Sequence, residues 1–315
     1  MKKLNVGVIG IGNLGQHHAR IYYSMSNVKL TAIVDVDSEK INKYKTLYPD
    51  AEFFQDYREA IPKADVFSVV VPTKYHFSIS KDLLLAGKHV LIEKPITTTL
   101  QEAEELISIA KQNNLIIQVG HVERFNPVVQ SLKNYITHPV FIESTRLSSF
   151  DPRVADVGVV LDLMIHDIDI ILCFVKSKLC SVESYGAKVF TDKEDIVKAR
   201  LRFENGCVCD LTASRISPTK YRKMRIFQPD SYLSLDFMRQ QAKIYKKKKS
   251  EIFSMSDIEL IRPKIKREEP LKLELESFVN SVLEKRRPVV TGEEAKDALS
   301  VAIEIVNQIK INERK

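Results

Sequence analysis

Three side chains in this 315-residue sequence have the types and spacing needed to oxidise an alcohol. Lys94 lies in the tripeptide Glu93-Lys94-Pro95 after a short apolar run, and Asp162 and His166 stand four residues apart in a second apolar segment. Oxidation of a secondary alcohol needs a base for the hydroxyl proton, a donor to the developing alkoxide and a group that orients them. We interpret His166 as the general base, Lys94 as the donor and Asp162 as the orienting residue.

The surroundings of these residues favour this chemistry and leave structural alternatives open. Lys94 follows a predicted strand, and open α/β sheets bind ligands at the carboxyl ends of their strands, although a surface lysine is the ordinary alternative. Asp162 and His166 share one face of a predicted helix because they are one turn apart. Their neighbours are apolar, so an internal Asp–His pair is the alternative there. Asp169 extends the same face as a cap or local partner.

A glycine-rich segment after the apolar run 4–9 predicts a dinucleotide site. Its three glycines allow a tight turn, close approach of the pyrophosphate and close helix–strand packing. Asp35 ends the next predicted strand, where a carboxylate accepts the ribose hydroxyls and repels a 2′-phosphate, so NAD is expected rather than NADP. The cofactor-binding residues expected from this part of the chain are Gly10, Gly12, Asn13, Leu14, Gly15 and Asp35.

A second loop is expected to contact the same cofactor. Val71-Pro72-Thr73 ends another predicted strand, and its backbone and Thr73 are expected to line the nicotinamide ribose. Thr73 is equally suited to capping the following helix. Pro95 fixes the turn that presents Lys94, and a cis bond before it is one option. The cofactor-binding residues expected from these loops are Pro72, Thr73, His76, Glu93 and Lys94.

The first 120 residues alternate between strand and helix patterns. Short, continuously apolar strands separated by helices predict a parallel sheet covered on both faces, which is a doubly wound α/β domain. The expected strands are 4–9, 29–35, 65–71, 89–92 and 115–119, and the expected helices are 13–25, 38–47, 76–87 and 99–113.

The pattern changes after Gly120, so we predict domains at 1–120 and 121–315. Successive strands with short turns, including Glu204-Asn205-Gly206, favour an antiparallel sheet in a second, α+β domain. Helices are expected at 125–136, 158–175, 270–286 and 292–311, and strands at 140–148, 179–190, 196–204, 207–214, 221–228, 231–236 and 241–246.

Composition narrows the class of protein. Hydrophobic content of 44% is ordinary for a globular protein, and no window has the length of apolar sequence that spans a bilayer. The N-terminus runs directly into a strand, so the cytoplasm is the expected compartment. The four cysteines contain no C-x-x-C pair, so we expect no metal site, and we expect Cys207 and Cys209 to be packed thiols. The net charge of +7 suits an anionic substrate, and no nucleic-acid or membrane module is visible.

The combination of Gly10–Gly15, Asp35, Glu93-Lys94-Pro95 and Asp162-x-x-x-His166 resembles the Gfo/Idh/MocA oxidoreductase family over nearly the whole chain. This resemblance implies a Rossmann domain, a second domain with an open-faced antiparallel sheet, and homodimers or homotetramers formed through that sheet. It also implies a catalytic trio that maps onto Lys94, Asp162 and His166.

Two stretches, 120–127 and 156–169, are similar to family members that oxidise UDP-N-acetylglucosamine at C3 for the 2,3-diamino sugar of lipid A. In those members the keto sugar passes to a PLP-dependent aminotransferase. The similarity implies that Glu123, Arg124 and Asn126 face the sugar and that Arg153 meets the diphosphate. For Arg124, a salt bridge to Glu123 or a helix-terminal contact is the structural alternative.

Two other functions are consistent with this sequence. The first is oxidation of a free polyol or sugar such as myo-inositol. The second is a non-catalytic regulator that keeps the nucleotide site to sense NAD(P). Regulators of that kind typically lose the Lys or the His, so the presence of Lys94 and His166 favours an enzyme.

Overall fold

A computed structural model describes residues 3–152, 156–251 and 254–311. The chain divides into two compact units. The first unit comprises Met1–Val122 and Glu269–Asp297, and the second comprises Glu123–Glu268 and Ala298–Lys315. The α+β character of the second unit and the α/β character of the first are both as predicted.

The first unit contains a six-stranded parallel sheet in the order β3-β2-β1-β4-β5-β6. This is the strand order of a Rossmann fold, with its switch point between β1 and β4. Its strands are β1 (Leu4–Ile9), β2 (Val28–Val34), β3 (Glu52–Phe54), β4 (Val66–Val69), β5 (His89–Glu93) and β6 (Ile117–Gly120).

Helices of the first unit bury apolar faces against this sheet. The start of α5 is fixed by a capping box, in which the Thr99 side chain accepts from Glu102 and the Glu102 carboxylate accepts from Thr99. The helices of this unit are α1 (Gly15–Ser24), α2 (Ser38–Lys45), α3 (Tyr57–Ala60), α4 (His76–Leu85), α5 (Leu100–Gln112) and α8 (Pro270–Leu283).

The segment Glu269–Asp297 belongs to the first unit, although the change of pattern at residue 120 placed it in the second domain. Leu275 and Phe278 of α8 are fully buried in the same core cluster as Val6 and Tyr22. The reason is tertiary, because α8 covers apolar surface left by α1 and β1. The last helix, α9 (Gly292–Gln308), begins in the first unit and ends in the second.

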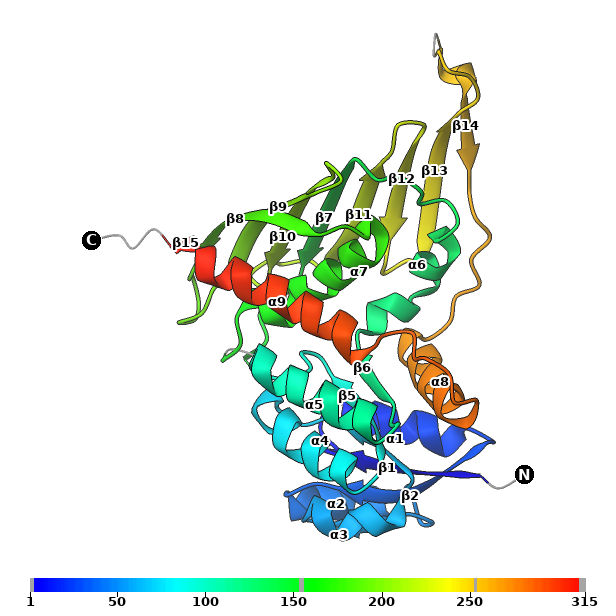
Figure 1. Ribbon diagram of the computed structural model, residues 1–315, viewed down its shortest axis with the longest axis vertical. Coiled ribbons are helices and arrows are strands. Elements are labelled where there is room, and N and C mark those ends of the chain that lie inside the picture. Colours follow the sequence, from blue (N-terminus) through cyan, green and yellow to red (C-terminus); the bar gives the residue numbers. More distant parts are fainter. Residues whose placement is uncertain (1–2, 153–155, 252–253, 312–315) are drawn as a thin grey trace. The chain divides into compact units, whose positions relative to one another are not determined.

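The second unit is built on a nine-stranded sheet in the order β14-β13-β12-β11-β7-β10-β9-β8-β15 (Figure 1). Most neighbours are antiparallel as predicted, but β10 pairs with β7 in parallel, and so does β15 with β8. The strands are β7 (Phe141–Leu147), β8 (Leu179–Ala187), β9 (Ile196–Phe203), β10 (Val208–Ser214), β11 (Tyr221–Phe227), β12 (Ser231–Asp236), β13 (Gln241–Lys247), β14 (Ile258–Ile261) and β15 (Lys310–Ile311).

Side chains alternate between the two faces of this sheet. On one face Leu201, Leu211 and Ile226 are buried in a core cluster with Met164 and Ile168. That cluster also includes residues of α6 (Pro127–Leu132) and α7 (Ile165–Val175), so these helices cover the apolar face. The opposite face, which we call the outer face, carries the charged and aromatic side chains that alternate with the buried ones along the same strands.

Of the four cysteines, Cys207 and Cys209 are packed as predicted. All four are free, and Cys207 and Cys209 are buried side by side with their sulfur atoms 3.8 Å apart. Among the described residues, no helix combines the length and the apolar character needed to cross a bilayer.

Candidate active site

In the glycine-rich turn after β1, the three glycines have different surroundings. Gly10 has a φ of +90°, and a Cβ there would lie 2.3 Å from the carbonyl oxygen of Val70. A Cβ on Gly15 would lie 1.8 Å from the carbonyl oxygen of Gly10, so this glycine permits close helix–strand packing. A Cβ on Gly12 would meet no atom within 4 Å. Gly12 therefore borders open space, where a pyrophosphate can approach the backbone.

Asp35, which is predicted to bind the cofactor, is hydrogen-bonded to this turn. Its carboxylate is buried and accepts hydrogen bonds from the backbone N–H groups of Ile11, at 2.9 Å, and Asp37, at 3.0 Å. Lys40 lies 3.6 Å away. The bond from Ile11 ties Asp35 directly to the glycine-rich turn. A carboxylate has about four acceptor sites, so two remain for the ribose hydroxyls of NAD.

We predict that Asp35→Ser weakens NAD binding by about 10- to 100-fold or more, because each hydrogen bond to a charged group contributes about 1.5–3 kcal/mol and about 1.4 kcal/mol corresponds to tenfold in affinity. NADP binding should weaken less, since the negative charge that repels a 2′-phosphate is removed. Calorimetric titration with both dinucleotides measures the two changes, and Asp50→Ser at an exposed site is the matched control. Unchanged NAD affinity in Asp35→Ser would contradict this role.

The loop after β4 is held by His76, the first residue of α4. Its Nε2 lies 2.8 Å from the carbonyl oxygen of Val71, and its Nδ1 lies 2.9 Å from that of Pro95. The buried ring thus connects the loops that follow β4 and β5. A direct contact between His76 and the cofactor stays a prediction. Thr73 is partly exposed in a 3₁₀ turn, Thr73–Tyr75, and Pro72 is exposed.

Glu93, Lys94 and Pro95 leave the carboxyl end of β5, and the Lys94–Pro95 bond is cis. The buried Glu93 carboxylate lies 3.1 Å from Nε2 of His18 in α1. It also lies against Gly120, where a Cβ would be 2.7 Å from Oε2 of Glu93. Glu93 therefore fixes the start of the loop, while Lys94 is partly exposed. Because β1, β4 and β5 are adjacent and parallel, the loops after them share one edge of the sheet.

In the second unit, Asp162 and His166 lie where two kinds of helix join. Asp162 lies in a π-helical segment, Val160–Met164, and His166 is the second residue of α7. Both side chains are partly exposed, whereas Leu163, Met164 and Ile165 between them are buried. A regular α-helix was predicted through this region, so the π segment is a correction. Such segments occur frequently at functional sites.

Buried ion pairs hold α7 in place behind these residues. Arg146 of β7 donates to Asp167 at 3.0 and 2.8 Å and to Glu123 at 2.8 Å. Arg124 donates to Asp169 at 2.7 and 3.1 Å. Burial opposes ionisation of Glu123, but the Arg146 guanidinium outweighs it and holds the pKa of Glu123 below its usual value. The stability that this carboxylate contributes is therefore present above the ordinary glutamate pKa and lost as the pH falls through the folded-state value.

This network includes residues that were expected to face a sugar. Glu123, Arg124 and Asn126 are buried, and the Asn126 amide donates to Glu123 and to the carbonyl oxygen of Phe237. The salt bridge that the structure shows for Arg124 is with Asp169, whereas the alternative predicted from the sequence had Glu123 as the partner. Contacts of these three residues with a substrate stay predictions. Arg153 lies outside the described residues.

Arg146→Met should destabilise the second unit by about 3–5 kcal/mol, because it leaves two buried carboxylates without their counter-charge. The free energy of urea-induced unfolding measures the effect. Arg225→Met removes a similar ion pair, with Glu143, from the exposed outer face and should cost about 1 kcal/mol or less. Equal stability of the two variants would contradict the structural role of the buried network.

Several residues that position the site were absent from the sequence interpretation. His18 is distant in sequence from Glu93, and Arg146 gives no local signal, since an arginine in a strand usually points to solvent. Arg222 of β11 also joins this network, since its guanidinium lies 3.6 Å from Glu123. Burial and the nearby guanidinium of Arg146 lower the pKa of Arg222, while Glu123, Asp167 and Asp162 oppose that shift.

Comparisons with known proteins agree with this architecture. A family model described as an oxidoreductase family with an NAD-binding Rossmann fold matches residues 4–121. The model of the GFO/IDH/MocA C-terminal domain matches residues 136–233.

Individual relatives cover almost the whole chain. A UDP-N-acetylglucosamine 3-dehydrogenase from Acidithiobacillus ferrooxidans is 31% identical over 97% of each chain, and its solved structure covers 98% of both chains with a TM-score of 0.91. A myo-inositol 2-dehydrogenase from Thermotoga maritima is 25% identical over 94% of this chain and 93% of its own. Levoglucosan dehydrogenase, solved with NADH and levoglucosan, shares the fold with a TM-score of 0.87 at 20% identity. The chain therefore belongs to the Gfo/Idh/MocA family of oxidoreductases with an NAD-binding Rossmann fold.

Proposed function

We propose that this protein oxidises the C3 hydroxyl of UDP-N-acetylglucosamine to the 3-keto sugar and forms NADH. The observation that carries the choice of substrate is the likeness to a UDP-N-acetylglucosamine 3-dehydrogenase over 97% of both chains. The net charge of +7 suits a substrate that carries a diphosphate. Inositol dehydrogenases are also relatives, at lower identity, so a free polyol is the second candidate.

The proposed reaction assigns one step to each predicted catalytic residue. His166 accepts the proton of the C3 hydroxyl, Lys94 donates a hydrogen bond to the C3 oxygen as negative charge develops there, and Asp162 orients the imidazole. Bound NAD supplies the hydride acceptor, so the alcohol loses one hydride and one proton and becomes a ketone. The glycine-rich turn and Asp35 fit the cofactor, because Gly12 borders open space and Asp35 keeps acceptor sites.

A substrate panel tests this proposal. NADH formation is followed at 340 nm with UDP-N-acetylglucosamine, UDP-glucose, UDP-N-acetylgalactosamine, free N-acetylglucosamine and myo-inositol, each with NAD and with NADP. A 2-oxoglutarate arm detects turnover that regenerates NAD on the enzyme. We expect UDP-N-acetylglucosamine with NAD to give the highest kcat/KM. Activity on myo-inositol without activity on any UDP-sugar would replace the first candidate with the second.

We further propose that the protein forms homodimers or homotetramers through the outer face of the nine-stranded sheet. Phe227, Tyr232 and Tyr245 stack in a row on that face, with ring centroids 5.0 and 5.5 Å apart. Aromatic side chains of this kind are enriched in protein interfaces. Sedimentation velocity should show a dimer or tetramer, and Tyr232→Glu should shift it toward monomer. A monomeric wild-type protein at micromolar concentration would contradict this proposal.

A further inference from the structure

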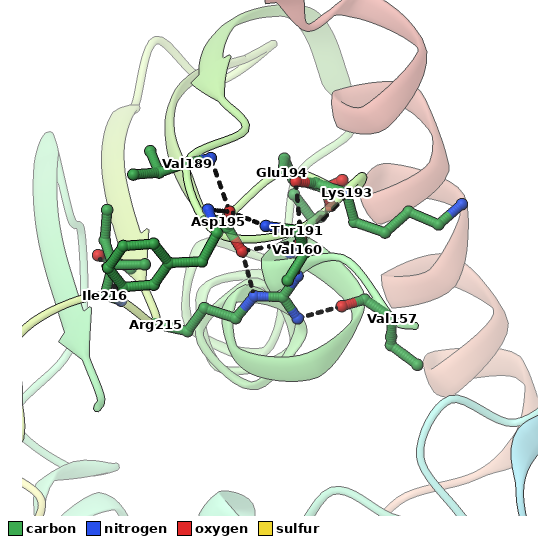
Figure 2. Close-up of polar contacts among 11 residues, drawn as sticks. Val157, Val160, Val189, Thr191, Lys193, Glu194, Asp195, Arg215 and Ile216 are labelled. Carbon is green, nitrogen blue, oxygen red and sulfur yellow. Dashed lines mark hydrogen bonds and ion pairs between the residues drawn. The ribbon is translucent and has the colours of Figure 1, made fainter. Parts of the chain in front are cut away.

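A buried cluster supports the chain segment that leads into the π-helical turn. We call it the Arg215 cluster, and it consists of Arg215, Asp195, Thr191 and Glu194 (Figure 2). Arg215 directly follows β10, and the other three lie in the connection between β8 and β9. The segment that they contact is 157–160, immediately before Asp162.

Asp195 is the fixed centre of the cluster. Its fully buried carboxylate accepts from the backbone N–H groups of Val189, Phe190 and Thr191, at 2.8, 2.7 and 3.0 Å. It also accepts from Nε of Arg215 at 2.7 Å. Burial raises the pKa of Asp195, but these donors outweigh it and hold the pKa well below its usual range. The carboxylate is therefore charged across the working pH range and does not change its contacts.

Arg215 connects Asp195 to the segment 157–160, which precedes Asp162. Its side chain is 1% exposed, and its Nη2 donates to Oγ1 of Thr191 at 2.7 Å. Its Nη1 donates to the carbonyl oxygen of Val157, as Figure 2 shows. The bonds from Arg215 to Thr191 and to Asp195 stay within the cluster. The bond to Val157 is the one that reaches the segment carrying Asp162 downstream.

Glu194 holds the next residues of the same segment. Its carbonyl oxygen accepts from the N–H of Val159 at 3.0 Å, and its Oε1 accepts from the N–H of Val160 at 3.4 Å. A Cβ on Gly158 would lie 1.9 Å from the Glu194 carboxylate, so the backbone touches this side chain closely. The cluster thus contacts four consecutive residues, and the last of them is the first residue of the π-helical segment.

We propose that Arg215, Asp195 and Glu194 are positioning residues that set the register of the π-helical turn carrying Asp162, and through it the orientation of His166. This inference rests on the catalytic roles proposed above for Asp162 and His166. A shift of one residue in the register of a helix rotates the following side chains by about 100°. The carbonyl oxygen of Gly158 already accepts from the N–H of Asp162 at 3.0 Å, so a change at Gly158 reaches Asp162 directly.

The decisive variants are on Glu194, because they leave the buried Arg215–Asp195 pair intact. Glu194→Ala removes the acceptor for Val160 and should lower kcat about 10- to 100-fold, since a displacement of about 1 Å costs up to about 10² in rate. The affinity for NAD should stay within about twofold, since the cofactor turn is in the other unit. Glu194→Gln keeps an oxygen acceptor at Oε1 and should recover most of the lost kcat. Glu204→Ala, at an exposed glutamate in the β9–β10 turn, is the matched control and should equal wild type.

Two further measurements separate positioning from general stability. Gly158→Ala would place a Cβ 1.9 Å from Oε1 of Glu194, so the carboxylate must move, and the variant should lower kcat in the same way. The pH profile of kcat should change its acidic limb in Glu194→Ala, because the orientation of the base has changed, and should return in Glu194→Gln. Wild-type kcat in both Glu194→Ala and Gly158→Ala would overturn the proposal. So would equal losses in Glu194→Ala and Glu194→Gln, or a loss explained by unfolding at the assay temperature.

The failure of this inference is distinguishable from the failure of the proposed function. His166→Ala measured beside these variants reports on the proposed function alone. If His166→Ala is inactive and both Glu194→Ala and Gly158→Ala are fully active, only the positioning role is excluded. If His166→Ala is fully active, the proposed catalytic role fails, and the positioning role built on it is overturned as well.

Discussion

Lys94→Ala is expected to lower kcat by about 10²- to 10³-fold, the loss typical when one donor to a developing oxyanion is removed. Binding of NAD should change by less than about threefold, because the glycine-rich turn and Asp35 do not depend on the lysine side chain. Steady-state kinetics at 340 nm and calorimetric titration with NAD measure the two quantities.

The matched control for this variant is Lys81→Ala. Lys81 is a partly exposed lysine of α4 that pairs with Glu105, so its removal should leave kcat unchanged. Lys94→Met adds a second test, since it keeps the length of the side chain without its charge and should be as slow as Lys94→Ala. A Lys94→Ala enzyme with wild-type turnover would show that Lys94 is a surface lysine only.

His166→Ala is expected to lower kcat by about 10²- to 10⁴-fold, which is the usual contribution of a general base. In the wild type, kcat/KM should fall at acidic pH as the base becomes protonated, and this limb should disappear in the variant. The pH profile from 5.5 to about 9.5 distinguishes loss of the base from loss of folding.

Asp162→Asn supplies the complementary measurement. If Asp162 orients the imidazole, its loss and that of His166 are coupled, so the double variant should be hardly slower than His166→Ala alone. Additive losses in the double variant would assign Asp162 and His166 to separate tasks. A His166→Ala enzyme that keeps the acidic limb would contradict the assignment of the base.

The first unit could be predicted well from the sequence, because its strands are continuous apolar runs and its helices have clear starts. The element at Leu4–Ile9 was predicted to the residue, and the capping chemistry of α5 begins where Thr99 places it. The strand Glu52–Phe54 was missed because it is three residues long with one exposed side chain. Short elements of this kind carry too little pattern to separate them from loops.

Pairing in the second unit could not be predicted from local pattern. The strands from β7 to β13 were all expected, but the parallel pairing of β7 with β10 depends on contacts between distant segments. For the same reason, the sequence placed α8 in the second domain, whereas the structure places it in the first unit. The sequence of a helix shows which of its faces is apolar, but it does not show which other element that face packs against.

At the candidate site, the functional residue types could be predicted from the sequence, but the buried residues that hold them in place could not. The glycines and Asp35 follow local rules: side chains at Gly10 and Gly15 would clash with backbone, and Asp35 accepts a hydrogen bond from the turn. The π-helical segment at Asp162 is defined by i→i+5 hydrogen bonds, which the periodicity of apolar residues does not reveal. Arg146 and Arg215 are buried by partners that lie 21 and 20 residues away, so no short motif marks them.

The measurement that tests the central claim most directly is hydride tracing with UDP-N-acetylglucosamine deuterated at C3. The enzyme is incubated with this substrate and NAD, and the NADH formed is examined by mass spectrometry. We predict that the NADH carries one deuterium and that the sugar product is the 3-ketone. Unlabelled NADH would show that the hydride leaves another carbon atom, and no NADH with this substrate would contradict the account.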